Sequence, residues 1–375
     1  MLRLGRGRVP AGSIDACPTR APDRKVREMT TTSVHVRSLT GAAPAFESEL
    51  GSTRAVDAGT LPILKNLSIK RIVLEPGAIR QPQWHVDADA LGYVLRGRVL
   101  VSTLGNADSF STFVVAPGQM FHVESGAIYH VENVGETTAE VILGLRNERP
   151  HVFALQNAMN SMTDNVLGNA YGLPGSAFAD FARGDALELM HREGPARIPD
   201  GATLPNARLF DIEGQAAPIS YEFGSARLAR KQYWAALDDI SMYSLRVAGD
   251  GMREPHWHPT TVEMGYVAQG HGRMRVLDPD GTLDEYLLEP GDVYFVPSAY
   301  PHHIEDVGED DIHFLIFFDQ PTPGDIGYRA TASAFSREVL AATFQVPERL
   351  LPQFPETPVD PLIVSRVNPV DPVQG

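Results

Sequence analysis

Cysteine is almost missing from this chain, because Cys17 is the only one among 375 residues. A single thiol excludes an intramolecular disulfide and any metal site built from several thiolates. A bound metal would therefore need nitrogen and oxygen ligands, and a reducing compartment is permitted.

Long apolar runs are also missing, since no stretch approaches the roughly 18 consecutive apolar residues of a membrane-spanning helix. Segment 1–28 is basic and lacks the apolar centre of a secretory signal. We therefore expect a cytoplasmic protein with no membrane partner. Met29 opens the run MTTTSVHV like a native start, which predicts that 1–28 form an extension without folded structure; a short transit peptide is the alternative.

Positive charge is scarce. The chain has 32 Lys and Arg against 47 Asp and Glu, a net charge of -15, and a pI near 5.2. A field of this sign repels nucleic acids and anionic membranes, so neither is expected as a partner. With 43% hydrophobic and 21% charged residues the composition is that of a globular protein, and the length indicates two domains.

What the chain does contain is one unit written twice. The stretch RQPQWHVDADALGYVLRG from Arg80 and the stretch REPHWHPTTVEMGYVAQG from Arg253 are 173 positions apart. HVENVG from His130 and HIEDVG from His303 repeat at the same offset. A constant offset indicates a duplicated domain.

Each copy consists of short β-rich runs, such as YVLRGRVLVSTL and DEYLLEPGDVYFVP, separated by Gly, Pro and Asp. This pattern favours an all-β sandwich or barrel over alternating strands and helices. A helix-like segment follows each copy, MTDNVLGNAYGL in the first and FSREVLAATFQV in the second. Between the copies, DFARGDALELMHRE predicts another helix before the Gly and Pro-containing linker GPARIPDGATLPNA.

The predicted organisation follows from this repeat. The first domain covers 29–175, a linker with a helix covers 176–208, and the second domain covers 209–348. The tail 349–375 is rich in proline and cannot be a central strand. An extended strap across the partner domain, or disorder, is expected for it.

The second copy holds a candidate metal site. His256 and His258 are two apart, so in a strand they project to one face. A bend at 259–261 can bring Glu263 round, and His302 arrives from another strand. Three imidazoles and a carboxylate suit Mn(II) or Fe(II) with open coordination positions. The alternative is a set of ordinary surface or core histidines, but burying four such groups without a cation would be costly.

Arg253 is three residues before His256, and simple alternation places it on the opposite face. If the Gly and Pro of GDGMREP break the pleat, its guanidinium could hold a carboxylate beside the metal. Otherwise Arg253 is a solvated surface residue. His303, next to His302, is expected to face outward.

The first copy repeats only one of the four ligands, His85. Gln83, His85, Ala90 and Tyr129 stand where the second copy has His256, His258, Glu263 and His302. We therefore expect one metal per chain and none in the first domain. A non-standard site of Gln83, His85 and His130, formed through a register shift, is the alternative.

The motifs PHWHPTTVEMGYVAQG and PGDVYFVPSAYPHHIEDVG resemble those of bicupins of the oxalate decarboxylase type, and KNLSIKRIVLEPGAIRQPQWH resembles the lead-in of a first cupin. The resemblance covers about 55–348. It implies an all-β fold of two double-stranded β-helix (cupin) barrels in tandem, each followed by short helices, and a homo-oligomer.

The same resemblance implies His256, His258, Glu263 and His302 as ligands of one metal, Mn(II) first and Fe(II) next. It also implies Arg253 and Glu263 as catalytic residues, with Arg253 orienting a small carboxylate substrate such as oxalate.

Two features depart from the resemblance. The stretch GLRNERPHVFALQNAMN after the first barrel has no Ser-Glu-Asn lid, and Ile316 stands where some members carry a glutamate. Three functions remain open: an oxalate decarboxylase-like enzyme, an O2-dependent oxidase or dioxygenase of another organic acid, and a non-catalytic carboxylate- or sugar-binding bicupin.

Overall fold

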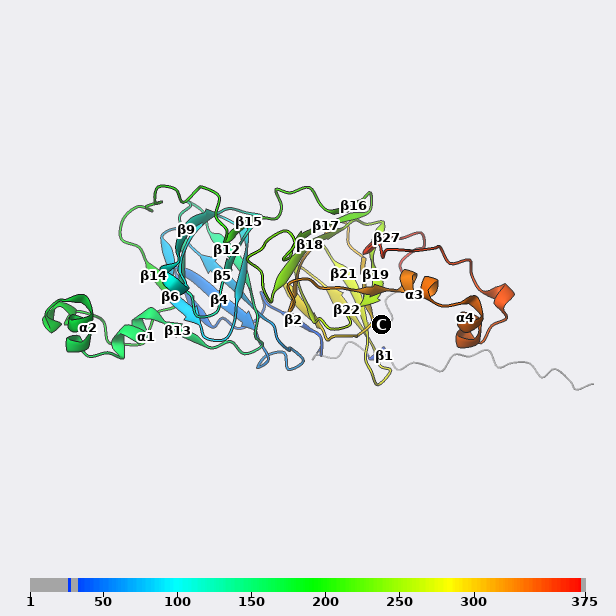
Figure 1. Ribbon diagram of the computed structural model, residues 1–375, viewed down its shortest axis with the longest axis horizontal. Coiled ribbons are helices and arrows are strands. Elements are labelled where there is room, and N and C mark those ends of the chain that lie inside the picture. The colour runs from blue at the N-terminus through cyan, green and yellow to red at the C-terminus, as the bar shows by residue number, and fades with distance from the viewer. Residues whose placement is uncertain (1–25, 28–32, 372–375) are drawn as a thin grey trace, which may run out of the picture.

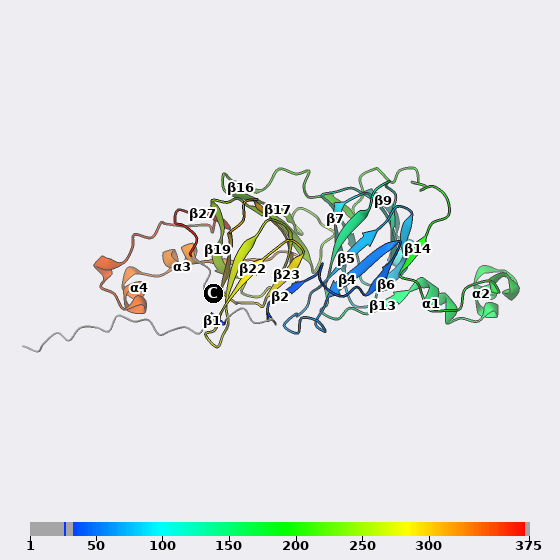
Figure 2. The same ribbon diagram turned by 180° about the vertical axis from the view of Figure 1, so that it is seen from behind.

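The computed structural model describes residues 26–27 and 33–371, with Val26, Arg27 and Asp108 placed by their backbone alone. Two β-barrels lie side by side, and a pair of short helices projects from the outer end of each (Figures 1 and 2). Each barrel consists of two facing sheets of mainly antiparallel strands. The predicted all-β tandem of cupin barrels, each followed by short helices, is confirmed.

The first barrel is built mainly from 46–154. One of its sheets has the order β15-β10-β7-β12-β5-β4-β3 and the other β13-β6-β11-β8-β9, with β14 also on β6. Their bounds are β3 Phe46–Ser48, β4 Gly51–Val56, β5 Ser68–Leu74, β6 Ala78–His85, β7 Ala90–Arg96, β8 Val99–Leu104, β9 Phe110–Val115, β10 Gln119–Val123, β11 Ile128–Asn133, β12 Ala139–Leu145, β13 Val152–Ala154, β14 Leu189–His191 and β15 Leu209–Asp211.

The second barrel repeats this layout. One sheet has the order β16-β17-β18-β25-β20-β23-β2 and the other β1-β22-β21-β24-β19-β26, with β27 also on β19. Their bounds are β1 Val26–Arg27, β2 Val36–Ser38, β16 Ile219–Tyr221, β17 Gly224–Ala229, β18 Ser241–Val247, β19 Gly251–Trp257, β20 Glu263–Gln269, β21 Gly272–Leu277, β22 Leu283–Leu288, β23 Asp292–Val296, β24 His302–Asp306, β25 Ile312–Phe318, β26 Ile326–Gly327 and β27 Ile363–Ser365.

The helices begin after each barrel closes. They are α1 Leu155–Asn160, α2 Asp164–Tyr171, α3 Tyr328–Ala334 and α4 Arg337–Phe344, with 3-10 turns η1 Asn106–Asp108, η2 Gly175–Phe178 and η3 Glu348–Leu350. The predicted helices correspond to α2 and α4, whose N-caps Thr163 and Ser336 accept backbone N–H groups through their hydroxyls. The short helices α1 and α3 were not predicted.

The prediction of a helix over DFARGDALELMHRE was wrong. Residues 180–188 are irregular and lead into β14, which pairs with the edge of β6. The backbone N–H of Gln81 donates to the Glu188 carbonyl, so this segment uses its hydrogen bonds against the barrel instead of within a helix.

The two barrels exchange a strand. β2 precedes the first barrel in sequence but pairs with β23 of the second, and β15 precedes the second barrel but pairs with β10 of the first. The expected boundaries at residues 29 and 209 therefore do not follow the sheets. Between the barrels lies a shared core that includes Leu39, Met120 and Phe295, all fully buried. The exchange and this core make the barrels one packed unit.

Both ends of the chain add to the second barrel. The predicted extension 1–28 lies outside the described residues except for Val26–Arg27, whose backbone pairs with β22. The tail runs back along its own barrel, where β27 pairs with β19, and not across the first domain. Among the described residues, no helix combines the length and apolarity needed to cross a membrane.

Candidate metal centre

Strands from both sheets of the second barrel bring the predicted metal ligands together. His256 lies on β19, His258 just beyond it, Glu263 at the start of β20 and His302 at the start of β24. Their ligand atoms all lie within 4.8 Å of one another, and none of the four residues is more than 5% exposed. The break after β19 supplies the bend that turns Glu263 inward.

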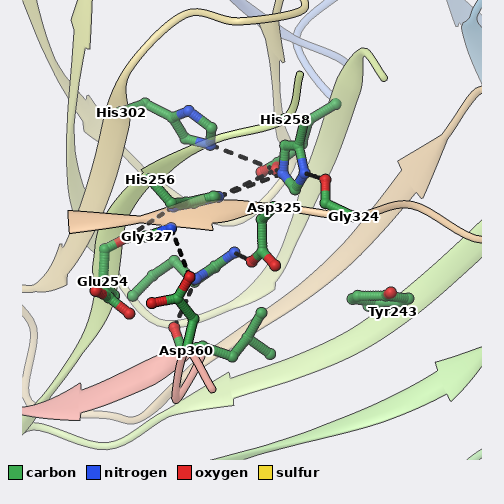
Figure 3. A network of polar contacts seen from close by, with 12 residues as sticks. Tyr243, Glu254, His256, His258, His302, Gly324, Asp325, Gly327 and Asp360 are labelled. Atoms are coloured by element: carbon green, nitrogen blue, oxygen red, sulfur yellow. Dashed lines mark hydrogen bonds and ion pairs between the residues drawn. The ribbon is translucent and has the colours of Figure 1, made fainter. Parts of the chain in front are cut away.

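Each histidine of this cluster is oriented by a backbone carbonyl, and Figure 3 shows those of Glu254 and Gly324. The Nδ1 atom of His256 is 2.6 Å from the Glu254 oxygen, that of His258 2.9 Å from the Gly324 oxygen, and that of His302 2.9 Å from the Tyr300 oxygen. A carbonyl only accepts, so each Nδ1 carries the hydrogen and each Nε2 presents a lone pair.

These lone pairs converge. His258 Nε2 lies 3.3 Å from His256 Nε2 and 2.8 Å from Glu263 Oε2, and His302 Nε2 has no hydrogen-bond donor among the described residues. Buried lone pairs facing one another and a carboxylate repel unless a cation lies between them. The donor set, three neutral imidazoles and one carboxylate, fits a divalent first-row metal.

The electrostatics favour the metal-binding forms. Burial opposes ionisation of Glu263, but the surrounding histidines hold its pKa well below the usual range. Burial, followed by the Arg253 charge, lowers the pKa of His256 well below its usual value. At neutral pH the carboxylate is therefore ionised and this imidazole is neutral, as metal binding requires.

Tyr294 supports the cluster and was missed from the sequence. Its hydroxyl donates to Glu263 Oε1 at 2.7 Å, and its ring lies on Gly265, where an added Cβ would be 2.1 Å from Tyr294 Cε1. A comparison of the two copies could have identified Tyr294 from the sequence. Phe121 replaces Tyr294 in the first copy, where Ala90 replaces Glu263, so hydroxyl and carboxylate are lost together.

Arg253 is buried, 5% exposed, because the pairing of β19 with β24 shifts register between Arg253 and His256. The pleat is therefore broken and simple alternation does not apply. The guanidinium donates to the Leu362 carbonyl at 2.7 Å and to Asp325 Oδ2 at 2.6 Å (Figure 3). Asp325 follows Gly324, whose carbonyl orients His258, and sequence reasoning did not select it. His303 lies on the other face of its strand, with Nε2 3.6 Å from Glu305.

The first barrel places an arginine where its sister has the cluster. Arg80, the counterpart of Arg253, donates to Tyr129 Oη at 3.1 Å and to Glu188 Oε1 at 2.8 Å. When the side-chain amide of Gln83 is flipped so that its oxygen faces Arg80, this oxygen accepts from Arg80 Nη1 at 3.0 Å. His130 instead faces Glu132, 3.7 Å away. His130 follows Tyr129, which pairs with Gln83, and this arrangement disfavours the alternative site of Gln83, His85 and His130.

His85 remains in the first barrel without a charge. Burial, then the Arg80 and Lys70 charges, lowers its pKa to about 3, and its Nε2 has no partner among the described residues. The Arg80 charge would also repel a metal cation that approached this imidazole.

The fold and these residues can now be set beside known proteins. The family model described as Cupin matches residues 38–177 and 219–349. The chain belongs to the cupin family. Its two copies of the domain make it a bicupin of the oxalate decarboxylase type.

Among curated proteins, this cupin is homologous to the oxalate decarboxylase OxdC of Bacillus subtilis, with 27% identity over 289 residues, 74% of this chain and 73% of that protein. A structure of the Bacillus subtilis oxalate decarboxylase at pH 4.6 superposes with a TM-score of 0.80 at 22% identity, covering 90% of this chain and 89% of the other. A structure of that enzyme concerned with its Mn(II) centres gives a TM-score of 0.79 at 23% identity, with 90% of each chain covered.

Proposed function

We propose that this bicupin is a metal-dependent enzyme of the oxalate decarboxylase type, acting on a small carboxylic acid at one catalytic metal site in the second barrel. The observation that carries the proposal is the convergence of three carbonyl-oriented imidazoles on Glu263. Mn(II) is the first choice of metal because homologous oxalate decarboxylases bind it, and Fe(II) is the second. The Arg80 guanidinium in the sister barrel supports a count of one catalytic metal per chain.

His256, His258, Glu263 and His302 would hold the ion. When bound, the metal supplies Lewis acidity and open coordination positions for the substrate. The protein supplies dry, rigid surroundings, since the ligands are buried and each ring is fixed by a backbone carbonyl. Tyr294 holds Glu263 in place.

Arg253 would clamp the substrate. Its guanidinium already donates to a carboxylate, that of Asp325, at 2.6 Å. A small carboxylic acid that reaches the cluster would compete with Asp325 for this cation. The loop that carries Asp325 runs between β25 and α3 and contains Pro321, Pro323 and Gly324, and displacement of Asp325 would require it to move.

Asp325 is the carboxylate best placed to handle a proton. Burial disfavours its ionised form, but the Arg253 charge keeps its pKa below the usual value. Once the substrate's carboxylate takes the guanidinium, Asp325 loses that stabilisation and binds a proton more readily. Decarboxylation of oxalate needs such a proton, because the carbon that loses CO2 must gain a hydrogen to become formate.

The second candidate is an O2-dependent oxidase or dioxygenase of another acid. Ile316, buried among apolar side chains, supports it because this position supplies no proton. A non-catalytic carboxylate- or sugar-binding bicupin is the third.

An assay of Mn(II)-loaded protein with oxalate separates the three functions. For the decarboxylase we expect formate and CO2 in equal amounts, without net O2 uptake. Peroxide or net O2 uptake would favour the oxidase, and no turnover of any acid the binding protein. His256→Ala should abolish the activity, and activity that survived it would place the chemistry elsewhere.

We also propose a homo-oligomer that works in the cytoplasm. The helix pairs carry exposed apolar residues, among them Val166 at 49%, Val339 at 50% and Phe344 at 58% exposure. Each pair borders an apolar groove, of 520 Å³ beside α1 and 420 Å³ beside α3 and α4. Apolar surface on this scale is typical of subunit interfaces.

A further inference from the structure

The two barrels carry charges of opposite sign at corresponding positions. In the second barrel, the carboxylates of Glu263 and Asp325 outnumber the Arg253 guanidinium. In the first barrel, Ala90 replaces Glu263, and Lys70 adds a second cation to the arginine of this barrel. A pocket that has lost a carboxylate and gained an ammonium group does not suit a metal ion, but it suits an anion.

Lys70 is directed into the first barrel. It lies on β5, two residues before the buried Ile72 of the first-barrel core, so the two side chains share a face of the strand. At the offset of 173 its counterpart is Tyr243, whose ring packs on Phe318 inside the second barrel. Within the described part of the chain, the Lys70 ammonium forms no hydrogen bond and no ion pair. It is therefore an inward-facing cation without a partner.

The surroundings of Lys70 leave its charge unbalanced. Burial, and then the Arg80 charge, lowers the pKa of Lys70 to about 8. The carboxylates of Glu188 and Asp57 oppose this shift. However, Glu188 forms its ion pair with Arg80, 2.8 Å away, and Asp57 accepts backbone N–H groups of its own turn. An anion next to Lys70 would stabilise the charged form of the ammonium group.

Two further polar groups near Arg80 lack partners. His85 Nε2 and Thr103 Oγ1 are buried, their residues being 2% and 1% exposed, and neither atom has a hydrogen-bond partner among the described residues. Thr103 lies directly opposite Tyr129, the His85 ring is 6.0 Å from the Tyr129 ring, and the Tyr129 hydroxyl accepts from Arg80. The charges of Arg80 and Lys70 both act on the His85 imidazole. Buried polar groups left in this state are costly unless a ligand bonds to them.

A cavity gives access to Lys70. It has a volume of 370 Å³, and its charged lining consists of Lys70, Arg149 and Asp57 together with the His151 imidazole. Arg149 donates to the Ala58 carbonyl at 3.2 Å and forms no ion pair with any residue that the structure describes. Positive charge therefore prevails at this entrance, which attracts anions although the chain as a whole is acidic.

We propose that the first barrel binds a small monocarboxylate without a metal, held by Lys70, His85 and Thr103 in the field of Arg80. An ammonium group, a hydroxyl and a neutral imidazole with its hydrogen on Nε2 can all donate to the two oxygens of one carboxylate. Lys70 and Arg80 against Glu188 leave a single positive charge, which one carboxylate balances. A dianion would bring a second charge that the pocket does not balance. This site does not depend on the proposed enzymatic function.

A formate titration of metal-free protein tests the proposal. Chelator-treated His256→Ala protein, whose metal cluster is disabled, is titrated with 13C-labelled formate and followed by NMR relaxation. We expect saturable binding that Lys70→Met weakens at least about tenfold, as for the loss of one charge-assisted hydrogen bond. Lys65→Met, at an exposed lysine nearby in sequence, should leave the affinity unchanged. Sulfate, a dianion, should bind more weakly than formate.

Thr103→Val separates binding from folding. Valine keeps the shape of the side chain and removes the unpartnered hydroxyl, so the melting temperature of formate-free protein should rise while formate binds roughly threefold to tenfold more weakly. Formate itself should raise the melting temperature of the His256→Ala protein, because it binds the folded state, and Lys70→Met should abolish that rise.

Three results would overturn the proposal. They are the absence of saturable formate binding, binding that survives Lys70→Met and so occurs elsewhere, for example at Arg253, and sulfate binding tighter than formate binding. None of them affects the catalytic proposal, because the measurement uses protein without the metal cluster and that proposal depends on His256.

Discussion

At the scale of single residues, one local rule recurs through the site. Every candidate ligand histidine donates Nδ1–H to a backbone carbonyl, at 2.6 Å for His256 and at 2.9 Å for both His258 and His302. The backbone therefore selects the tautomer and aims Nε2, so little rotamer entropy remains to be lost when an ion binds. Sequence spacing could predict which histidines meet, but not how the carbonyls orient them.

Tyr294→Phe tests the support of Glu263. The change removes the hydroxyl that donates to Oε1 at 2.7 Å and keeps the ring on Gly265. We expect Mn(II) to bind about 10–100-fold more weakly, as for other second-sphere changes at metal sites. Isothermal titration calorimetry of the apo protein with Mn(II) measures this affinity. Tyr93→Phe removes a hydroxyl that donates to Glu213 between the barrels and should leave the affinity unchanged.

Asp325→Asn tests proton handling. If oxalate displaces Asp325 from Arg253, the pKa of Asp325 rises in the complex, so decarboxylation should fall as the pH rises through that raised value. The amide cannot carry the proton, and we expect formate production about 10²–10⁴-fold slower. The Mn(II) content should not change. Glu356→Gln, in the exposed tail, is the matched control. An unaltered pH profile in Asp325→Asn would assign the proton to another group.

At the scale of elements, the β-bulge of β19 decides what faces the site. Register shifts between Arg253 and His256 in the second barrel and between Tyr129 and Val131 opposite β6 in the first. Strict alternation predicted the wrong face for Arg253 because Pro255 cannot donate to the ladder. Strand content and the helices α2 and α4 were predictable from periodicity. The segment 180–193 was not, because its pairing with β6 overrides its helical pattern.

The pairing of β21 with β24 predicts acid sensitivity. Arg273 lies opposite Glu305, is 1% exposed, and donates to its carboxylate. The neighbouring His303 contributes most to lowering the pKa of Glu305 to about 2, and Arg273 adds to this effect while burial opposes it. The pKa of Glu305 is lower in the folded than in the unfolded protein, so its ionised carboxylate stabilises the fold. This contribution to the free energy of unfolding is complete above about pH 4.5 and is lost as the pH falls toward 2.

Glu305→Gln should remove this dependence of the unfolding free energy on pH. At neutral pH the variant leaves the Arg273 guanidinium buried without its carboxylate, so we expect a loss of about 3–5 kcal/mol of unfolding free energy. The difference from wild type should shrink as the pH drops below 4.5. Urea unfolding at pH 7, 4.5 and 3 measures it. Glu309→Gln, on an exposed turn, should track the wild type at every pH, and a pH-independent difference for Glu305→Gln would refute the assignment.

At the scale of the whole molecule, the duplication explains why the two barrels share one architecture and why a comparison of the two copies shows where their candidate sites differ. The two barrels, their helix pairs and their exchanged strands repeat at one offset, and that regularity made the architecture readable from the sequence. The four residues His256, His258, Glu263 and His302 could be chosen from their spacing, and the first copy keeps only His85 of this set. The strand exchange could not be predicted, since β2 and β15 are short and their partners lie in the other half of the chain.

The position of the helix pairs leads to a prediction about assembly. They project from opposite ends of the molecule, α1 and α2 at one and α3 and α4 at the other (Figure 1). Each end offers both an apolar groove and an exposed apolar helix face. We therefore expect the helix of one end to enter the groove of the other end on a second chain, a head-to-tail contact that gives a ring where the rotation between chains closes.

Val339→Asp with Phe344→Asp should break that contact. Both side chains are at least half exposed on α4, so the single chain tolerates charge there, whereas a buried interface would not. Sedimentation should give a multiple of 40.9 kDa for the wild type and 40.9 kDa for the variant, with metal content and melting of the barrels retained. Phe110→Asp, 65% exposed on β9 and outside both grooves, should assemble as the wild type does. A wild-type chain that sediments as a monomer would contradict this prediction.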